Sequence, residues 1–162
     1  MKNVLVTGGA GFIGSNLVKH LLKEYKEVEK IVVLDNMFTG KEENKVDHKK
    51  VIYIESPTWD IDKFFSDKEG LFDTVFHFGE YSRIVKSFND SKYVMKTNLH
   101  GTTCVLEKCR KWKSKLIYSA SSSKFGNDGK DENLSPYSWV KSKIVELIKN
   151  YNDWYNLQYE VC

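Results

Sequence analysis

The sequence predicts a three-layer α/β fold, in which a doubly wound parallel sheet carries helices on both faces. Short β-branched runs alternate with longer amphipathic stretches along the 162 residues. The short runs are almost continuously hydrophobic, which is typical of strands buried on both sides. Parallel strands need right-handed crossover connections, so helices must cover both faces of the sheet. We expect strand order 3-2-1-4-5, a sixth strand that is marginal or missing, and a ligand at the carboxyl ends of the strands.

The expected elements follow from hydrophobic spacing. Apolar residues recur at helical intervals in the longer stretches, as Leu17, Leu21 and Leu22 do. No repeat, low-complexity segment or linker divides the chain, so we expect one domain over residues 1–162. The predicted strands are 4–7, 31–34, 51–54, 74–77, 116–119 and 158–161, and the predicted helices are 12–25, 60–67, 90–112 and 135–155.

Composition excludes several classes of protein. With 41% hydrophobic and 29% charged residues the chain is typical of a globular domain. No apolar run reaches the roughly 20 residues of a membrane span, and the N-terminus begins as a strand where a signal peptide would need a charged region, so we expect a cytoplasmic location. Three cysteines, an odd number with no C-x-x-C pair, predict neither a disulfide scaffold nor a metal site. A net charge of +3, with both signs scattered, favours neither a nucleic-acid nor a membrane partner.

The strongest motif is a glycine-rich turn that joins the first strand to the first helix. Gly8, Gly11 and Gly14 have the spacing G-x-x-G-x-x-G, and no lysine follows as in a P-loop. Gly8 can adopt the positive φ of a tight turn, Gly11 allows the backbone to approach a pyrophosphate, and Gly14 allows close helix packing. The helix then begins at Phe12 and Ile13, where unpaired N–H groups favour phosphate. These five residues form the predicted phosphate-binding site.

An acidic residue, Asp35, closes the second strand about 20 residues beyond this turn. A carboxylate there can accept hydrogen bonds from an adenosine ribose and would repel a 2′-phosphate, so the sequence favours NAD over NADP. We include the neighbouring Asn36 in the predicted cofactor site. The alternative is that Asp35 and Asn36 only cap a turn.

The start of the last helix carries a second candidate group. Ser135 is a good N-cap and Pro136 suits the first helical position. Tyr137 and Lys141 are four residues apart and therefore project from one helical face. The ordinary pKa of a tyrosine is about 10, so it is a poor base at neutral pH unless nearby positive charge favours the phenolate. The alternative is an ordinary pair on a helix surface.

Five segments occur in a fixed order along the chain. They are the glycine turn at 7–15, His77-Phe78-Gly79, Thr97-Asn98 with Gly101-Thr102 and Val105-Leu106-Glu107, the serine-rich run 118–126, and Ser135-Pro136-Tyr137-x-x-x-Lys141. Taken together, these segments resemble the extended short-chain dehydrogenase/reductases of the nucleotide-sugar epimerase and dehydratase type. The likeness runs nearly end to end, and the ordered set is far more specific than any one motif. The resemblance implies NAD as the cofactor, a nucleotide sugar as the substrate, and cofactor-site roles for Phe78, Gly79 and Asn98, although Asn98 could instead be a helix cap.

The resemblance also implies catalytic roles. Tyr137 and Lys141 would form the nicotinamide half of the cofactor site. Tyr137 would take the proton of a sugar hydroxyl while hydride leaves the same carbon for the nicotinamide, and Lys141 would also hold the nicotinamide ribose. Ser121 would hydrogen-bond that hydroxyl. We select Ser121 over Ser122 and Ser123 because it lies five residues before Gly126, as the family's catalytic Ser or Thr does. The serines could also be an ordinary loop.

The sequence departs from the family in four places. The segment after the third strand, Glu55 to Asp60, offers no assignable adenine contact, and only 11 residues lead from Gly126 to Tyr137. Ser122 and Ser123 stand where dehydratases often carry Asp-Glu, which argues against the 4,6-dehydratase subtype. Family members are considerably longer, with a C-terminal substrate domain, so we expect a chain truncated in or near strand 6. It would be either a fragment or a natural short form.

Two questions of class stay open. The chain could belong to an enzyme lineage that acts on nucleotide sugars, or it could be a non-catalytic NAD-binding module. The helices at 90–112 and 135–155 also carry apolar residues around more than one stripe, and the family pairs such helices between subunits. We therefore expect a homodimer through them, with aggregation as the competing outcome. The apolar residues in question are Tyr93, Val94, Trp139, Val140, Leu147 and Tyr151.

Overall fold

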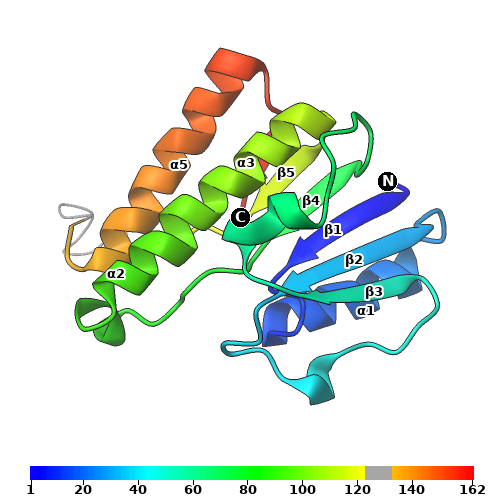
Figure 1. Ribbon diagram of the computed structural model, residues 1–162, viewed down its shortest axis with the longest axis horizontal. Helices are drawn as coiled ribbons and strands as arrows, with labels where there is room; N and C mark the ends of the chain where they lie inside the picture. The colour runs from blue at the N-terminus through cyan, green and yellow to red at the C-terminus, as the bar shows by residue number, and fades with distance from the viewer. Residues whose placement is uncertain (123–132) are drawn as a thin grey trace.

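The chain folds around a six-stranded sheet in which every pair of neighbouring strands is parallel (Figure 1). This computed structural model describes residues 1–122 and 133–162. The strand order is β3-β2-β1-β4-β5-β6, so the predicted fold class and order are confirmed. The sixth strand is present but only three residues long, and it pairs with β5 through Leu116 and Tyr159. The strands are β1 (Asn3–Thr7), β2 (Lys30–Asp35), β3 (Val51–Glu55), β4 (Thr74–His77), β5 (Lys115–Tyr118) and β6 (Tyr159–Val161).

Three of the four predicted helices form, and two short 3₁₀ helices, η1 and η3, lie outside the predicted stretches. The helix expected at 60–67 is wrong: a six-residue 3₁₀ helix, η2, forms there instead. It begins at Thr58, directly after extended backbone at Pro57, and ends at Lys63, so it is short enough for the tighter geometry to be tolerated. The described helices are α1 (Phe12–Glu24), η1 (Glu42–Asn44), η2 (Thr58–Lys63), η3 (Val85–Phe88), α2 (Ser91–Val94), the π-helical η4 (Met95–His100), α3 (Gly101–Trp112) and α5 (Pro136–Tyr155).

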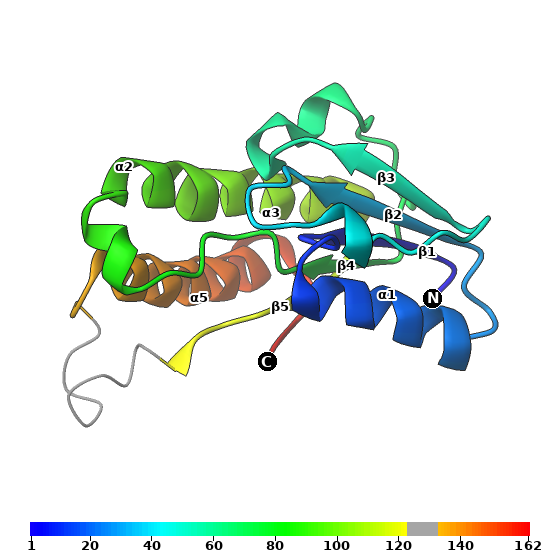
Figure 2. The same ribbon diagram turned by 90° about the horizontal axis from the view of Figure 1, so that it is seen from below.

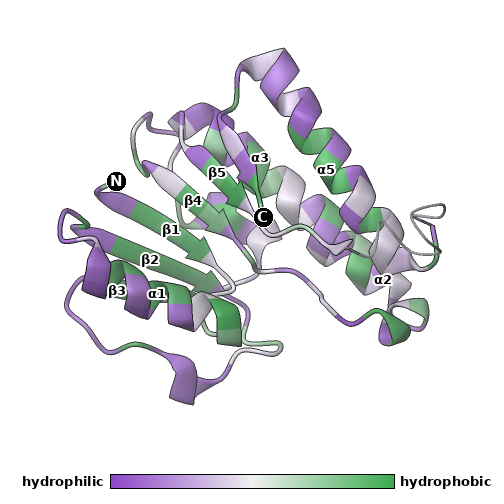
Figure 3. Ribbon diagram, turned by 180° about the vertical axis from the view of Figure 1, so that it is seen from behind, coloured by the Kyte–Doolittle hydropathy of each residue, from purple (hydrophilic) through white to green (hydrophobic). Residues whose placement is uncertain are grey.

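Helices cover the two faces of the sheet with two separate cores (Figure 2). Strand side chains alternate between faces. Val4 and Val6 of β1 therefore pack with Val18 and Leu21 of α1, whereas Leu5, between them, joins the core under α3 and α5. Figure 3 shows the central strands as hydrophobic bands between helices of mixed polarity. Burial on both faces does not extend to β3, because this edge strand leaves Ile52 46% exposed.

The two long helical regions lie side by side (Figure 1). The predicted helix 90–112 is one continuous helix over α2, η4 and α3, and its π-helical turn contains the buried residues Thr97 and Asn98. Val94 and Val140, which we expected on an apolar outer surface, are fully buried within this chain. That part of the argument for a homodimer is wrong, and self-association stays a prediction.

The described residues were also searched for a membrane-spanning helix and for a group of metal-ligating side chains. No helix in residues 1–122 or 133–162 is long and apolar enough to cross a membrane. The same residues contain no group of His, Cys, Asp or Glu side chains arranged to hold a metal ion.

Candidate functional site

A cavity of about 350 Å³ lies at the carboxyl ends of the strands and joins the glycine turn to the first turn of α5. Segments that follow β1, β2, β3, β4 and β5 all contribute to its wall. This is the sheet edge at which ligands bind in open α/β folds. The predicted site residues that line it are Gly8, Gly11, Phe12, Ile13, Gly14, Asp35, Asn36, Phe78, Gly79, Tyr137 and Lys141.

The glycine turn is shaped by close backbone approaches. Gly8 has φ +72°, and a Cβ there would lie 2.7 Å from the backbone nitrogen of Gly79. A Cβ on Gly14 would collide with the carbonyl oxygen of Gly8. Gly11 is the N-cap of α1, so the first N–H groups of the helix face the cavity side without intrahelical acceptors. The turn therefore leaves backbone donors, with no Cβ on its three glycines, where an anion can approach.

Asp35 is a buried carboxylate that does two things. Its Oδ2 accepts a hydrogen bond from the backbone N–H of Ala10 at 2.8 Å, and its Oδ1 accepts one from Met37 at 2.8 Å. These bonds tie the end of β2 to the glycine turn, which is the capping role that the sequence left open. The same side chain lines the cavity. Asn36 beside it accepts a hydrogen bond from the backbone N–H of Phe38 at 3.0 Å.

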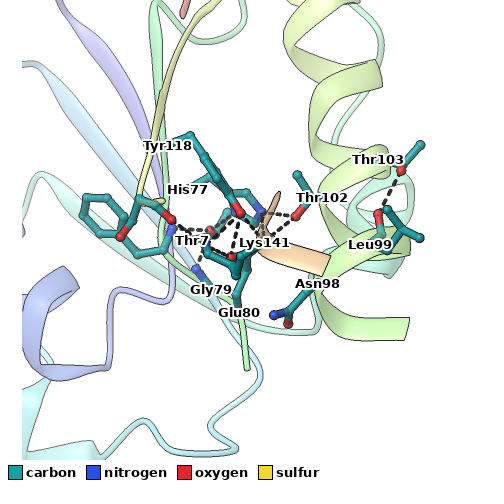
Figure 4. A network of polar contacts seen from close by, with 12 residues as sticks. Thr7, His77, Gly79, Glu80, Asn98, Leu99, Thr102, Thr103, Tyr118 and Lys141 are labelled. Atoms are coloured by element: carbon teal, nitrogen blue, oxygen red, sulfur yellow. Dashed lines mark hydrogen bonds and ion pairs between the residues drawn. The ribbon is translucent and has the colours of Figure 1, made fainter. Parts of the chain in front are cut away.

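A buried chain of hydrogen bonds begins at Thr7, just before the turn (Figure 4). The Thr7 hydroxyl oxygen accepts from the backbone N–H groups of Phe78 and Gly79 at 3.2 and 3.0 Å. Its own proton is then available for Nδ1 of His77, 2.6 Å away. His77 therefore carries its proton on Nε2, which donates to the Thr102 hydroxyl at 2.7 Å. Burial lowers the pKa of His77 from 6.5 to about 4, so its imidazole is neutral at pH 7.

This chain ends on Glu80, which the sequence analysis did not single out. Thr102 donates to Glu80 Oε1 at 2.8 Å, and the Tyr118 hydroxyl lies 3.1 Å from both carboxylate oxygens. Lys141 completes the cluster with an ion pair to Glu80 Oε2 and a hydrogen bond to the Tyr118 hydroxyl at 2.7 Å. The side chains of Glu80 and Lys141 are 6% and 5% exposed. No motif marked Glu80, because only its packing distinguishes it from a surface acid.

α5 brings the predicted tyrosine and lysine to the cavity. The Ser135 hydroxyl accepts a hydrogen bond from the backbone N–H of Ser138 at 3.0 Å, and Pro136 occupies the first turn, so the predicted helix start is confirmed. Tyr137 and Lys141 follow one turn apart, both buried and both lining the cavity. The Tyr137 backbone N–H reaches the Ser87 hydroxyl at 3.4 Å, which fixes this turn against η3.

Two other predicted residues lie outside the cavity wall. Ser119 and Ala120 line the cavity, and Ser121, next along the chain, is not among the described lining residues. Ser123 and Gly126, used to select Ser121, lie outside the described residues. Asn98 is fully buried behind the cavity, where its amide accepts from the Tyr81 N–H at 2.7 Å and donates to the Tyr81 carbonyl at 2.9 Å.

The wall after β3 carries no acid. Ser56, Pro57 and Thr58 line the cavity there. The Thr58 hydroxyl is buried and has no hydrogen-bond partner among residues 1–122 and 133–162. The sequence analysis assigned no role to Ser56, Pro57 or Thr58, because no motif marks them.

The parallel sheet, with a glycine-rich turn and a cavity at its carboxyl edge, has the architecture of a dinucleotide-binding α/β protein. A family model described as the NAD dependent epimerase/dehydratase family matches residues 4–161, so the chain belongs to that family. The resemblance inferred from the five motifs is confirmed, and NAD is the cofactor of the family.

Individual relatives place the chain within that family. A putative UDP-glucose 4-epimerase of Methanocaldococcus jannaschii is 30% identical over 98% of this chain and 53% of its own length. The Bordetella bronchiseptica enzyme WbmF, solved with NAD⁺, has a TM-score of 0.85 at 30% identity, covering 99% of this chain and 48% of that one. UDP-glucose 4-epimerase of Thermotoga maritima, solved with UDP-glucose, has a TM-score of 0.84 at 28% identity, covering 98% and 54%. The chain spans about half the length of the relatives it matches.

Proposed function

We propose that this chain forms the NAD-binding and catalytic part of a nucleotide-sugar epimerase or oxidoreductase, with Tyr137 as the base. One observation carries the proposal: a single cavity connects the glycine turn and Asp35 at one end with Tyr137 and Lys141 at the other. A dinucleotide needs both an anion-binding helix end and a reactive end, and this cavity supplies both.

The residues present suit NAD. The turn has no Cβ at Gly8, Gly11 or Gly14, so the N–H groups at the start of α1 can receive the pyrophosphate. Asp35 lines the cavity with its carboxylate and can accept hydrogen bonds from ribose hydroxyls. The same negative charge opposes a 2′-phosphate, so NAD would bind more tightly than NADP. When bound, NAD supplies a hydride acceptor for alcohol oxidation.

The chain's own groups would handle the proton. Tyr137 lies at the cavity wall, where its phenolate oxygen would accept the proton of a sugar hydroxyl and become the neutral phenol. Lys141, one turn further along α5, would hold a cofactor ribose, and the positive charge of an oxidised nicotinamide beside Tyr137 would favour the phenolate. Ser121 would orient the sugar hydroxyl. The relatives solved with UDP-glucose and with NAD⁺ and UDP support a nucleotide sugar as the substrate.

Two measurements test the proposal. Calorimetry should show NAD bound at least tenfold more tightly than NADP, and Asp35→Asn should narrow that gap; tighter binding of NADP by the unaltered chain would refute the role of Asp35. For the chemistry, absorbance at the reduced-nicotinamide band should rise when UDP-glucose and related sugars are added to the NAD complex. Tyr137→Phe should abolish the signal although NAD still binds, and Tyr159→Phe, on the edge strand β6, should leave the signal intact.

The rival function is a non-catalytic NAD-binding module. One observation favours it: the three N–H donors of Lys141 are all used within the chain, by Glu80, Tyr118 and the Ser119 carbonyl. If NAD binds normally and no sugar in the panel is oxidised, either by this chain or by a longer form of the protein, the module is the better description.

A further inference from the structure

Glu80 is a buried carboxylate surrounded by donors. Tyr118 accepts a hydrogen bond from Lys141, so its own hydroxyl proton is directed at Glu80. Thr102 accepts from His77 Nε2, so its proton is also directed at Glu80. Burial and the Glu80 charge raise the pKa of Tyr118 well above its ordinary value, which keeps this phenol a donor. Both carboxylate oxygens of Glu80 therefore accept hydrogen bonds from hydroxyl or ammonium donors.

The Glu80 anion neutralises Lys141. Both side chains are almost completely buried, so little water screens the pair, and their opposite charges cancel at this end of the cavity. The nearby His77 adds no charge at pH 7, since its pKa is about 4. Arg83 also lines the cavity but is exposed and therefore screened by solvent. The charge of this end is accordingly set by whether Glu80 is present opposite Lys141.

We propose that Glu80 is a positioning residue that holds Lys141 and, by balancing its charge, raises the affinity of the site for NAD⁺ relative to NADH. The inference rests on the proposed function, which places the nicotinamide beside Tyr137 and Lys141. The oxidised ring carries a positive charge and the reduced ring does not, so an unbalanced ammonium would penalise only the oxidised form. Glu80 removes that penalty.

The test is the ratio of the dissociation constants of NAD⁺ and NADH. Glu80→Gln keeps the size of the side chain and an acceptor for Lys141 but deletes the charge. It should weaken NAD⁺ binding relative to NADH binding by about tenfold, or about 1.4 kcal/mol, because the unbalanced ammonium of Lys141 would repel the positively charged oxidised ring. NADH affinity should change much less. An unchanged ratio with both forms still bound would overturn the proposal.

Matched variants separate charge from packing. Glu80→Asp retains the charge and should restore the ratio to within about twofold of the original, whereas Tyr118→Phe removes a neutral partner of Lys141 and should change both affinities equally. A tenfold ratio change in Tyr118→Phe would contradict a charge-based role. Lys141→Met removes the positive partner instead and provides a test even if Glu80→Gln does not fold. The carboxylate of Glu80, left without its partner, should strengthen NAD⁺ binding relative to NADH binding. No change in the ratio of the two dissociation constants, or a change in the opposite direction, would contradict the proposal.

Failure of this inference is distinguishable from failure of the proposed function. If the unaltered chain binds neither NAD⁺ nor NADH, the proposed function is wrong. If the unaltered chain binds both and Glu80→Gln leaves the ratio of the two dissociation constants unchanged, only the role of Glu80 is wrong. Circular dichroism melts of each variant show whether it is folded at the temperature of the binding measurements.

Discussion

The two ends of the cavity differ in which groups form them: backbone groups dominate at the glycine turn, and side chains dominate at α5. At the glycine turn the wall is backbone: Gly8 and Gly14 leave no room for a Cβ, and Asp35 ties that backbone in place. At the α5 end the wall is side chains, with the buried ion pair of Glu80 and Lys141 at its centre. The glycine turn forms only because Gly8 and Gly14 have no Cβ, so a single added methyl group should disrupt the turn. A side-chain network instead depends on which donors meet which acceptors, so it should respond in graded steps.

The largest expected effect is at the backbone end. Gly8→Ala should lower the free energy of unfolding by about 3–4 kcal/mol, since it combines left-handed strain with a clash against Gly79. It should also abolish NAD binding. Urea unfolding and calorimetry measure the two effects.

Gly70 provides a matched control for that substitution. Its φ of +73° equals that of Gly8 within a degree, yet nothing lies within 4 Å of the position of its Cβ. Gly70→Ala should therefore cost only about 1–2 kcal/mol and leave NAD binding intact. Equal losses at the two positions would show that φ alone, and no close approach, makes the turn sensitive.

The next effect, at the side-chain end, depends on pH. The folded pKa of His77 is about 4 and its ordinary value is 6.5, so the unfolded chain takes up this proton first as the pH falls. Stability should therefore be full above pH 6.5 and decline between pH 6.5 and 4, by up to about 3 kcal/mol from this residue. Urea midpoints from pH 7 to 4 measure the slope.

His77→Gln should flatten this decline, because the titrating group is gone, although the variant starts from a lower stability at pH 7. His20→Gln, at an exposed position of α1, should retain the full slope. A variant lacking His77 with an undiminished slope would place the acid sensitivity in the carboxylates instead.

The contrast between the two ends also explains what sequence reasoning could reach. The glycine turn, Asp35 and the Ser135 helix start are local: each residue type suits a backbone conformation a few positions away, so spacing alone predicts them. Glu80 lies only three residues beyond His77, yet its partners Thr102, Tyr118 and Lys141 come from α3, β5 and α5. No local pattern encodes a meeting of four elements. The short η2 was mispredicted for a related reason, since apolar spacing does not report how much room the packing leaves.

A smaller effect is expected at Asn98, which supports the loop that carries Glu80. Asn98→Ala should cost about 2–3 kcal/mol because it leaves the buried N–H and C=O of Tyr81 without partners. It should also weaken NAD, as the segment 79–83 lines the cavity. Thermal melts measure the first effect and calorimetry the second. Asn16→Ala, which removes an exposed bond to Phe12, should cost less than about 0.5 kcal/mol; a comparable loss at both asparagines would contradict a special role for burial.

The smallest effect is expected at the cap of α5, where a locally predicted feature supports the network that was not predicted. Ser135→Ala removes the acceptor for the Ser138 N–H and should cost about 1 kcal/mol. Ser135→Gly should cost only a few tenths, because glycine is itself tolerated at N-caps. Since Tyr137 lies in the first turn and Lys141 in the second, fraying should reduce Tyr137-dependent sugar oxidation more than it changes the NAD⁺ to NADH ratio, which Glu80 governs. Urea unfolding and parallel binding measurements on both variants check this. A shift in the ratio of the NAD⁺ and NADH dissociation constants in Ser135→Ala as large as in Glu80→Gln would contradict this. The helix start and the Glu80–Lys141 ion pair would then act as one unit, and the locally encoded cap would not be independent of the long-range network.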